Sequence, residues 1–490
     1  MSRGEASPFD LYSAAREEMI HEGFAPDFPP AVGAQVAKLK ARPDPPAAPG
    51  VRDLRSLLWS SIDNDTSRDL DQVEVAERVP AGIRILIAVA DVDSAVPAGS
   101  PMDQHAASET TSVYTGVRTF PMLPEEVSTD LTSLNESEDR LAVVIDMVVD
   151  GEGSVASASI YRALVRNRAQ LTYNAIGPWL SGLSGPPPKV AASADLLMQL
   201  KMQDEAARLL REERRRLGAL NMDRAEAEAV ISDGAVVGIK VRQKNRATEL
   251  IENFMVAANG AMARTLFDAG VSSIRRVVRT PQRWPRIVEL ASRYQETLPE
   301  DPDVRALNGF LQKMKVKAAA QYADISLAVV KLLGPGEYVL SRPGERGERH
   351  FALSASDYTH STAPNRRFAD TITQRLIKAV LWKTPSPYSD AELDAIARNC
   401  TLKEGAARKV ERVMNKRIAA VALHSRIGET FAGVVTGVTS KGVFVRIVNP
   451  PAEGLLIRGQ EGVDVGDSLR VRLLDADPRR GYIDFAHAEA

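Results

Sequence analysis

The chain has almost no cysteine and no long hydrophobic run. Cys400 is the single cysteine among 490 residues, so no intrachain disulfide can form, and a reducing compartment such as the cytoplasm is expected. The apolar stretch over 141–149 contains Asp146 and is far shorter than the roughly 20 residues that span a membrane. The N-terminus lacks the apolar segment of a signal peptide. These absences favour a cytoplasmic protein without a membrane partner.

Neither sign of charge is in excess over the whole chain. It contains 62 Lys and Arg against 64 Asp and Glu, and a hydrophobic fraction of 44% excludes a disordered or collagen-like protein. Residues 240–317 nevertheless hold fifteen Lys and Arg against eight Asp and Glu. This local excess has two interpretations, a solvated surface or a positively charged channel for a phosphate backbone.

The hydrophobic pattern predicts an α+β protein in three parts. Residues 1–50 form a small helical region with a Pro-rich linker, residues 51–427 a large domain, and residues 428–490 a five-stranded OB-fold barrel. In the large domain, strands are expected over 83–92 and 141–149, a loop over 177–189, and helices over 192–217, 247–266, 365–382 and 391–426.

Four aspartates lie close together in the segment over 61–75. They are Asp63, Asp65, Asp69 and Asp71. Crowded carboxylates repel one another unless a cation neutralises them, and a hard divalent ion with oxygen ligands is the usual solution. One interpretation is an EF-hand calcium loop, although Arg68 stands where that loop needs glycine. The others are a catalytic Mg²⁺ site and an acidic surface loop.

Longer motifs carry a resemblance to a known family. The stretch IDNDTSRDLD (62–71) resembles the signature of the RNB domain of the ribonuclease II / RNase R family. Further stretches that resemble the family follow in order over 111–134, 249–259, 350–376 and 400–412. The segment from 428 resembles the OB-fold RNA-binding domain of the ribosomal protein S-one type. Long family members carry two cold-shock barrels before the catalytic domain, and we expect this chain to lack them.

The resemblance implies a fold and an activity. The expected fold is a mixed sheet with helices around a channel, followed by the barrel. The expected activity is that of a 3′-to-5′ exoribonuclease that uses Mg²⁺ or Mn²⁺ to hydrolyse single-stranded RNA to nucleoside 5′-monophosphates. A monomer without an obligate protein partner is expected. The alternative is an RNA-binding protein that keeps the channel but has weakened catalysis.

The resemblance also implies a metal site. Asp63, Asp69 and Asp71 match three of the four motif aspartates as metal ligands, and Asp71 is expected to be catalytic as well. The fourth position is Gln72, which offers a carbonyl oxygen but no charge. This substitution is the main reason to consider weakened catalysis.

Two arginines follow Pro364, which is typical of the first turn of a helix. In that position Arg366 and Arg367 would add to the attraction that a helix N-terminus has for anions. Arg366 matches the catalytic arginine of the family, and both arginines are predicted to contact substrate. The alternative is a surface ion pair between Arg366 and Asp370.

The remaining predicted substrate contacts are spread over the chain. Tyr114 matches the tyrosine that stacks on the 3′-terminal base, although an aromatic residue there could also be ordinary core. Met222 replaces the phenylalanine expected on the other side of that base. Glu411 matches a glutamate that approaches the terminal nucleotide, with a helix-surface ion pair as the alternative. Phe444 in the barrel is predicted to stack on a base, and Lys441 replaces a second aromatic.

Overall fold

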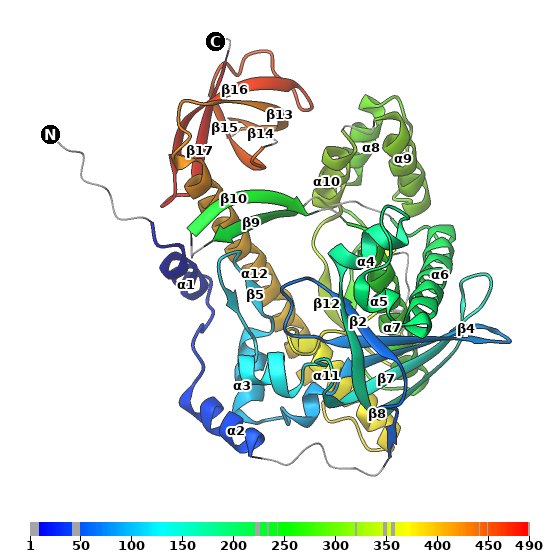
Figure 1. Cartoon of the computed structure of the whole chain (residues 1–490). Helices are drawn as coiled ribbons and strands as arrows, with labels where there is room; N and C mark the ends of the chain where they lie inside the picture. Colours follow the sequence, from blue (N-terminus) through cyan, green and yellow to red (C-terminus); the bar gives the residue numbers. More distant parts are fainter. Residues whose placement is uncertain are drawn as a thin grey trace.

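The large domain is built on a six-stranded mixed sheet (Figure 1). The computed structural model describes residues 9–41, 50–220, 226–232, 235–242, 244–318, 321–345, 350–353, 358–440, 442–447 and 449–488. The sheet has the order β1–β8–β2–β3–β4–β7, with β1 (Val51–Asp53), β2 (Trp59–Asp63), β3 (Gln72–Val79), β4 (Gly82–Ala90), β7 (Asp139–Val149) and β8 (Val155–Thr172). The long strand β8 pairs in parallel with β1 and β2 and antiparallel with β7.

The central strands form where the sequence is rich in β-branched residues. In the antiparallel pair of β4 and β7, Ile87 lies opposite Ile145, and both side chains are fully buried. Such residues fit a pleated surface that is covered on both faces. The strands predicted over 83–92 and 141–149 are therefore confirmed.

Five helices surround this sheet or extend from it (Figure 1). They are α4 (Tyr173–Leu180), α6 (Ala194–Arg216), α7 (Arg246–Asp268), α11 (Phe368–Trp382) and α12 (Asp390–His424). Capping boxes at Asn245 and Ser389 start α7 and α12, which explains why these two helices begin close to their predicted positions. The 35-residue helix α12 runs from the large domain to the barrel.

Two predicted boundaries were wrong. The segment over 177–189 was expected as a loop, but its first residues complete α4, with Pro178 inside the helix. Packing of α4 against α7 and β8, with Ile176 fully buried, outweighs the low helix propensity of proline. The helix expected from 365 begins at Phe368, so the two arginines before it lie outside the first turn.

Smaller elements complete the part of the structure that precedes the barrel. The helices are α1 (Leu11–His21), α2 (Pro30–Lys40), α3 (Pro101–Glu109), α5 (Pro188–Ala191), α8 (Trp284–Arg293), α9 (Val304–Lys317), α10 (Tyr322–Leu333), η1 (Val92–Ser94), η2 (Glu126–Leu131) and η3 (Phe351–Leu353). The strands are β5 (Val113–Tyr114), β6 (Thr119–Phe120), β9 (Glu226–Ser232), β10 (Ala235–Arg242), β11 (Ser273–Val277) and β12 (Glu337–Ser341). Helices α8, α9 and α10 share a hydrophobic core of their own, around Trp284 and Phe310.

The last part of the chain is a closed five-stranded barrel, as predicted. Its order is β13–β14–β15–β17–β16, with β13 (Thr430–Thr439), β14 (Gly442–Ile447), β15 (Ala452–Arg458), β16 (Ser468–Asp477) and β17 (Tyr482–His487). In β16, Val471 and Leu473 are fully buried, whereas Arg470 and Arg472 between them are not. The barrel therefore has an apolar interior and arginines on its outer surface.

None of the helices in the described part of the chain is long and apolar enough to span a lipid bilayer.

The buried carboxyl of Glu74 on β3 generates a stability prediction. Its side chain is fully buried, both carboxyl oxygens lack a hydrogen-bond partner, and burial raises the pKa of Glu74 well above its usual value. The folded protein therefore holds this proton more tightly than the unfolded chain, so stability should fall as pH rises above the unfolded pKa of about 4.5. We predict that Glu74→Gln raises the melting temperature by a few degrees at pH 8 and by much less at pH 5.

Thermal unfolding of the two proteins at both pH values measures this difference. Glu125→Gln, at an exposed position, is the matched control and should change neither melting temperature. An equal shift at pH 5 and pH 8 would contradict the assignment of the effect to ionisation of Glu74.

Candidate metal and nucleic-acid site

A cavity of about 1050 Å³ collects most of the predicted site residues. It lies between the loop that joins β2 to β3, the β5–β6 hairpin, α7 and the segment before α11. Six of the predicted residues line it, namely Asp63, Asp69, Asp71, Gln72, Tyr114 and Arg366. They come from three distant parts of the sequence, so the fold brings them together.

The acidic loop turns along one wall of this cavity. Strand β2 ends at Asp63 and strand β3 begins at Gln72, so strands flank the loop where an EF-hand would have helices. Asp63 accepts hydrogen bonds from the Asn64 N–H (2.7 Å) and the Ser67 hydroxyl (2.8 Å). Asp65 is exposed and accepts a hydrogen bond from the Asn174 amide instead of lining the cavity. The EF-hand interpretation is therefore wrong.

Asp71 is the most buried of the three cavity aspartates. It accepts a hydrogen bond from the Asn365 N–H (3.1 Å), and its Oδ2 lies 3.5 Å from Arg366 Nε. Burial raises the pKa of Asp71 to about 7; Arg366 opposes this rise and Asp69 adds to it. Burial likewise raises the pKa of Asp69. Arg366 therefore offsets only part of the negative charge of Asp69 and Asp71.

This donor set fits a hard divalent cation. Carboxylate oxygens in a polar cavity with uncompensated negative charge are the ligands that Mg²⁺ prefers. Within the described residues, the only three ligand atoms within 4.8 Å of one another belong to a cluster on α1, so the cavity aspartates are more widely spaced. Mg²⁺ usually keeps several waters and binds substrate phosphates, so open spacing of the carboxylates suits it. Asp63, Asp69 and Asp71 are the residues that would hold the ion.

The two predicted arginines face different directions. Arg366 lines the cavity, and its backbone C=O accepts a hydrogen bond from the Ser112 N–H (3.0 Å). The Arg367 guanidinium instead donates two hydrogen bonds, of 2.9 and 2.7 Å, to the fully buried Asp370. The alternative that paired Arg366 with Asp370 is wrong, because Arg367 occupies that carboxylate. The geometry gives Arg367 a structural role, and its predicted contact with substrate finds no support at this cavity.

Tyr114 projects from the β5–β6 hairpin into the cavity. Its neighbour Val113 is fully buried, whereas Tyr114 is 43% exposed, as expected for consecutive residues on opposite faces of a strand. Glu411 on α12 accepts a hydrogen bond from the Tyr114 N–H (3.3 Å). The alternative of an ordinary core position for Tyr114 is therefore excluded, and Glu411 is placed directly behind the tyrosine.

Of the other two predicted contacts, Phe444 does not line this cavity. Met222 and Lys441 lie outside the described residues. Phe444 is on β14, where it alternates with the buried Val443 and Val445 and so faces outward from the barrel. A base-stacking role for Phe444 stays a prediction about the barrel surface.

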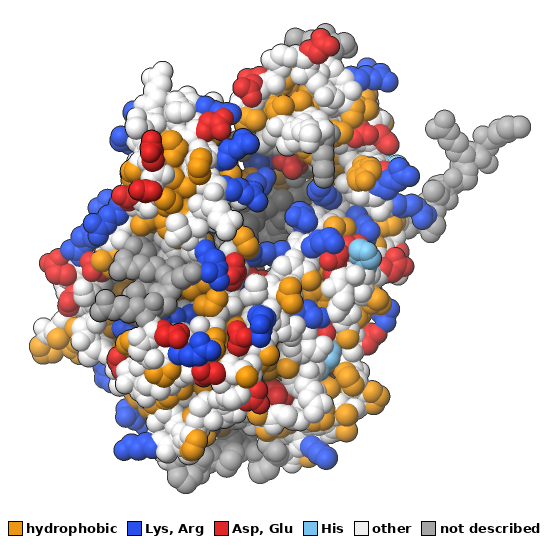
Figure 2. All heavy atoms as spheres, turned by 180° about the vertical axis from the view of Figure 1, so that it is seen from behind, with side chains coloured by type: hydrophobic (Ala, Val, Ile, Leu, Met, Phe, Trp, Pro, Cys, Tyr) orange, Lys and Arg blue, Asp and Glu red, His pale blue; other side chains and the backbone are white. Residues whose placement is uncertain are grey.

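A second cavity, of about 890 Å³, adjoins the first. Thr248 and Glu252 of α7 line both cavities. Six of the residues that line the second cavity carry a positive charge, namely Arg214, Lys244, Arg276, Arg283, Lys331 and Arg408. On the back of the molecule, Figure 2 shows a hollow between the barrel and α8–α10, with Lys and Arg side chains gathered around it.

The cations of the basic excess over 240–317 lie in two kinds of place, and a channel for a phosphate backbone stays a prediction. Arg276 and Arg283 line the second cavity, whereas Arg279 and Arg286 form ion pairs with Glu337 and Glu289 at the surface.

Helix α7 also lines the first cavity, which the sequence did not predict. Thr248, Ile251, Glu252 and Met255 line the first cavity. Their spacing of three and four residues places them on one face of a helix, so the periodicity of 247–266 contained the signal. The sequence alone did not show that this face borders a cavity.

Comparison with protein families finds matches over most of the chain. The RNB domain matches residues 51–383, and the RNase II-type exonuclease C-terminal S1 domain matches residues 429–488. Ribonuclease R of Thermotoga maritima is 30% identical over 502 aligned residues, which cover 94% of this chain and 68% of that protein. The chain spans between 54% and 69% of the length of the curated relatives that it matches.

Solved structures share the fold. RNase R of Mycoplasma genitalium, solved in complex with ribose-methylated single-stranded RNA, superimposes with a TM-score of 0.87 at 24% identity, over 98% of this chain and 78% of that one. Yeast Ssd1, described as a pseudonuclease, superimposes with a TM-score of 0.69 at 15% identity, over 94% of this chain and 57% of that one. The same architecture thus occurs in a protein that is described as lacking nuclease activity.

The placement of the aspartates predicts how the chain binds a divalent cation. We expect Mn²⁺, a spectroscopic substitute for Mg²⁺, to bind to the first cavity and Asp69→Asn to weaken that binding by about tenfold or more, because one charged ligand is lost. Asp65→Asn is the matched control, because Asp65 belongs to the same loop but faces Asn174. Titration followed by electron paramagnetic resonance measures both affinities. Equal weakening by the two substitutions would contradict the assignment of the ligands.

Proposed function

The chain belongs to the RNB family, and from this membership we propose that it is a metal-dependent 3′-to-5′ exoribonuclease. The proposed substrate is single-stranded RNA, and the proposed products are nucleoside 5′-monophosphates. We further propose that Mg²⁺ is the metal ion, with Mn²⁺ as a substitute. A monomer in the cytoplasm is the form that we propose to be active.

The observation that carries this proposal is the shared cavity. The aspartates Asp63, Asp69 and Asp71 line the same space as Tyr114 and Arg366, although the three segments that carry them are far apart in the sequence. A protein that only binds RNA has no use for several carboxylates beside a polyanion, because they would repel it. Carboxylates that can hold a divalent ion, beside an arginine that can bind a phosphate, instead suit phosphodiester hydrolysis.

Each of these residues has a distinct task in the proposed reaction. The ring of Tyr114 would stack on the base of the 3′-terminal nucleotide, a contact that every base can make. Arg366 would bind the scissile phosphate and stabilise the charge that develops on it. Asp63, Asp69 and Asp71 would hold Mg²⁺, which when bound neutralises phosphate charge and activates water. Because Arg366 already contacts Asp71, phosphate and carboxylate would share this guanidinium.

The second cavity supports a path for the rest of the RNA. Its six cations outnumber the two glutamates that line it, Glu252 and Glu404, so the cavity would attract the phosphates of RNA. It adjoins the first cavity at Thr248 and Glu252. The outward-facing Phe444 and the arginines of β16 would add a binding surface on the barrel. Sequence-independent binding follows, because none of these contacts reads a base edge.

The alternative function is RNA binding with weakened catalysis. Gln72 lines the cavity in place of the fourth aspartate, and Ssd1 shows that the fold alone does not guarantee a nuclease. The retention of Asp63, Asp69, Asp71 and Arg366 at one cavity favours hydrolysis. We therefore propose that Gln72 lowers the affinity for metal without abolishing the reaction.

Asp71 generates the sharpest test of catalysis. Asp71→Asn preserves size and removes one negative charge beside the phosphate, so RNA affinity in Mg²⁺ should stay the same or rise slightly. Turnover should fall by at least about two orders of magnitude, or ~3 kcal/mol, because the carboxylate acts mainly in the transition state. Single-turnover cleavage of one oligonucleotide measures the effect.

Asp65→Asn again serves as the control, compared at an equal folded fraction. It should reduce the rate far less, because Asp65 lies outside the cavity. A loss for Asp65→Asn as large as that for Asp71→Asn would overturn the assignment.

Tyr114 generates a prediction about product length. Tyr114→Ala should weaken the hold on the RNA 3′ end, by roughly 1–3 kcal/mol for one stacked base, while hydrolysis continues. The shortest product should therefore become longer, and denaturing gels of a 5′-labelled RNA will show it. Tyr114→Phe, which keeps the ring, should leave the product length unchanged. An unchanged product length in Tyr114→Ala would contradict stacking of the 3′-terminal base on this ring.

A further inference from the structure

Helix α1 shares a hydrophobic core with the hairpin that carries Tyr114 and with α12. A hydrophobic core is shared by residues of α1, of the β5–β6 hairpin and of α12, namely Leu11, Ala14, Ala15, Met19, Phe24, Val113, Phe120, Ala407, Val410, Met414 and Ile418. Val113 and Tyr114 face opposite sides of the hairpin because they are neighbours on a strand. The face of the hairpin that joins this core is therefore the one that points away from the cavity, and α12 links that face to α1.

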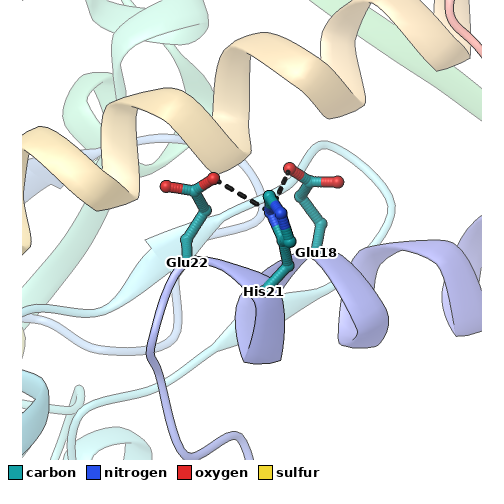
Figure 3. Close-up of side chains that lie close together, drawn as sticks. All are labelled: Glu18, His21 and Glu22. Carbon is teal, nitrogen blue, oxygen red and sulfur yellow. Dashed lines mark ion pairs between the residues drawn. The ribbon is translucent and has the colours of Figure 1, made fainter.

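Ion pairs connect α1 to α12 as well. Glu22 lies 2.6 Å from the Lys409 ammonium, and Glu18 lies 3.2 Å from the Arg417 guanidinium. Figure 3 shows the carboxylates of Glu18 on α1 and of Glu22, the residue directly after α1, pointing toward α12, with His21 between them. The side chain of Glu18 is only 11% exposed and that of Glu22 only 10%. Because two cations already face these carboxylates, we interpret the cluster as an ion-pair network between helices and not as a metal site.

The chain that follows α1 is also tied to the same two elements. The Lys403 ammonium of α12 donates a hydrogen bond to the Gly23 C=O (2.6 Å). The Ala25 N–H donates a hydrogen bond to Glu109 (3.0 Å), at the end of α3 and four residues before the hairpin. The N-terminal region thus connects α12 to the end of α3, the helix that precedes the hairpin.

We propose that α1 is a positioning element for the 3′-terminal nucleoside, an inference that rests on the proposed exoribonuclease function. By packing on α12 within the core that α12 shares with the hairpin, α1 maintains the hydrogen bond between the Tyr114 N–H and Glu411 of α12. That contact fixes the strand from which the tyrosine ring reaches the cavity. Glu18 and Glu22 are the positioning residues, because their ion pairs set the place of α1 on α12.

The proposal separates binding from chemistry. Asp71 is held by Asn365 and Arg366, and neither residue contacts α1 in the shared core. Loss of α1 docking should therefore affect the hold on the RNA end and leave the bond-breaking step nearly unchanged. This split between KM and the single-turnover rate is not expected from a general loss of stability.

The test uses charge reversal in the full chain. Glu22→Lys places a positive charge opposite Lys409 and should raise KM for RNA by about three- to tenfold, within the range for partial loss of one stacked base. It should also lengthen the shortest product, while the single-turnover rate at saturating RNA stays within about twofold of wild type. The double variant Glu22→Lys/Lys409→Glu restores opposite charges and should recover the wild-type values. Glu17→Lys, on the exposed face of α1, is the matched control and should change nothing.

Hydrogen exchange of residues 113–120 without RNA provides a readout that is independent of activity. We expect faster exchange in Glu22→Lys and, as a second variant, in Ala15→Glu, which puts a charge at a fully buried position of α1. Wild-type KM and product length in a variant with faster exchange would overturn the inference, as would unchanged exchange in both variants. Absence of RNA cleavage by the wild-type protein would instead refute the proposed function, while the exchange data would still report whether α1 supports the hairpin.

Discussion

Two contacts to one carboxylate hold the two halves of the site together. The Asn365 N–H and the Arg366 guanidinium both reach Asp71, although they are 294 and 295 residues away in the sequence. The acidic loop alone would be a set of repelling charges, and the arginine alone would be an anion site without a metal. The chemistry that we propose depends on the acidic loop and Arg366 lining the same cavity.

Contacts elsewhere in the fold keep Arg366 next to Asp71. Helix α11, which follows the arginines, is fastened to the segment directly after β4 and to α3 by ion pairs of Lys378 with Asp91 and of Arg375 with Asp93 and Asp103. Removing one partner of such a pair leaves an uncompensated buried charge, so these pairs fix the position of the helix strictly. Arg367 pairs with Asp370 within the first turn of α11 itself, which orders the start of the helix next to Arg366. Rigid support of this kind keeps Arg366 at the distance from Asp71 that the proposed reaction requires.

The sequence predicted those parts of the fold that local patterns determine. Strands β4 and β7, the long helix α12 and the five-stranded barrel all follow from hydrophobic periodicity, and the structure contains them. The cavity residues were predicted from motifs, since no local pattern shows that Tyr114 meets Arg366. The direction of Arg367 was not predictable, because it depends on a helix that starts at Phe368 and on the buried position of Asp370. Likewise, the amphipathic pattern predicted α1 as a helix, but only tertiary packing shows that it supports the hairpin of Tyr114.

The most direct test of the central claim is the fate of one single-stranded RNA labelled at its 5′ end in one sample and at its 3′ end in another. With Mg²⁺, the account predicts a ladder that shortens stepwise from the 3′ end in the first sample and immediate release of a labelled mononucleotide in the second. With EDTA, both RNAs should stay intact. RNA that is bound but uncut in Mg²⁺ would show the alternative to be correct, and internal cleavage would contradict an exoribonuclease.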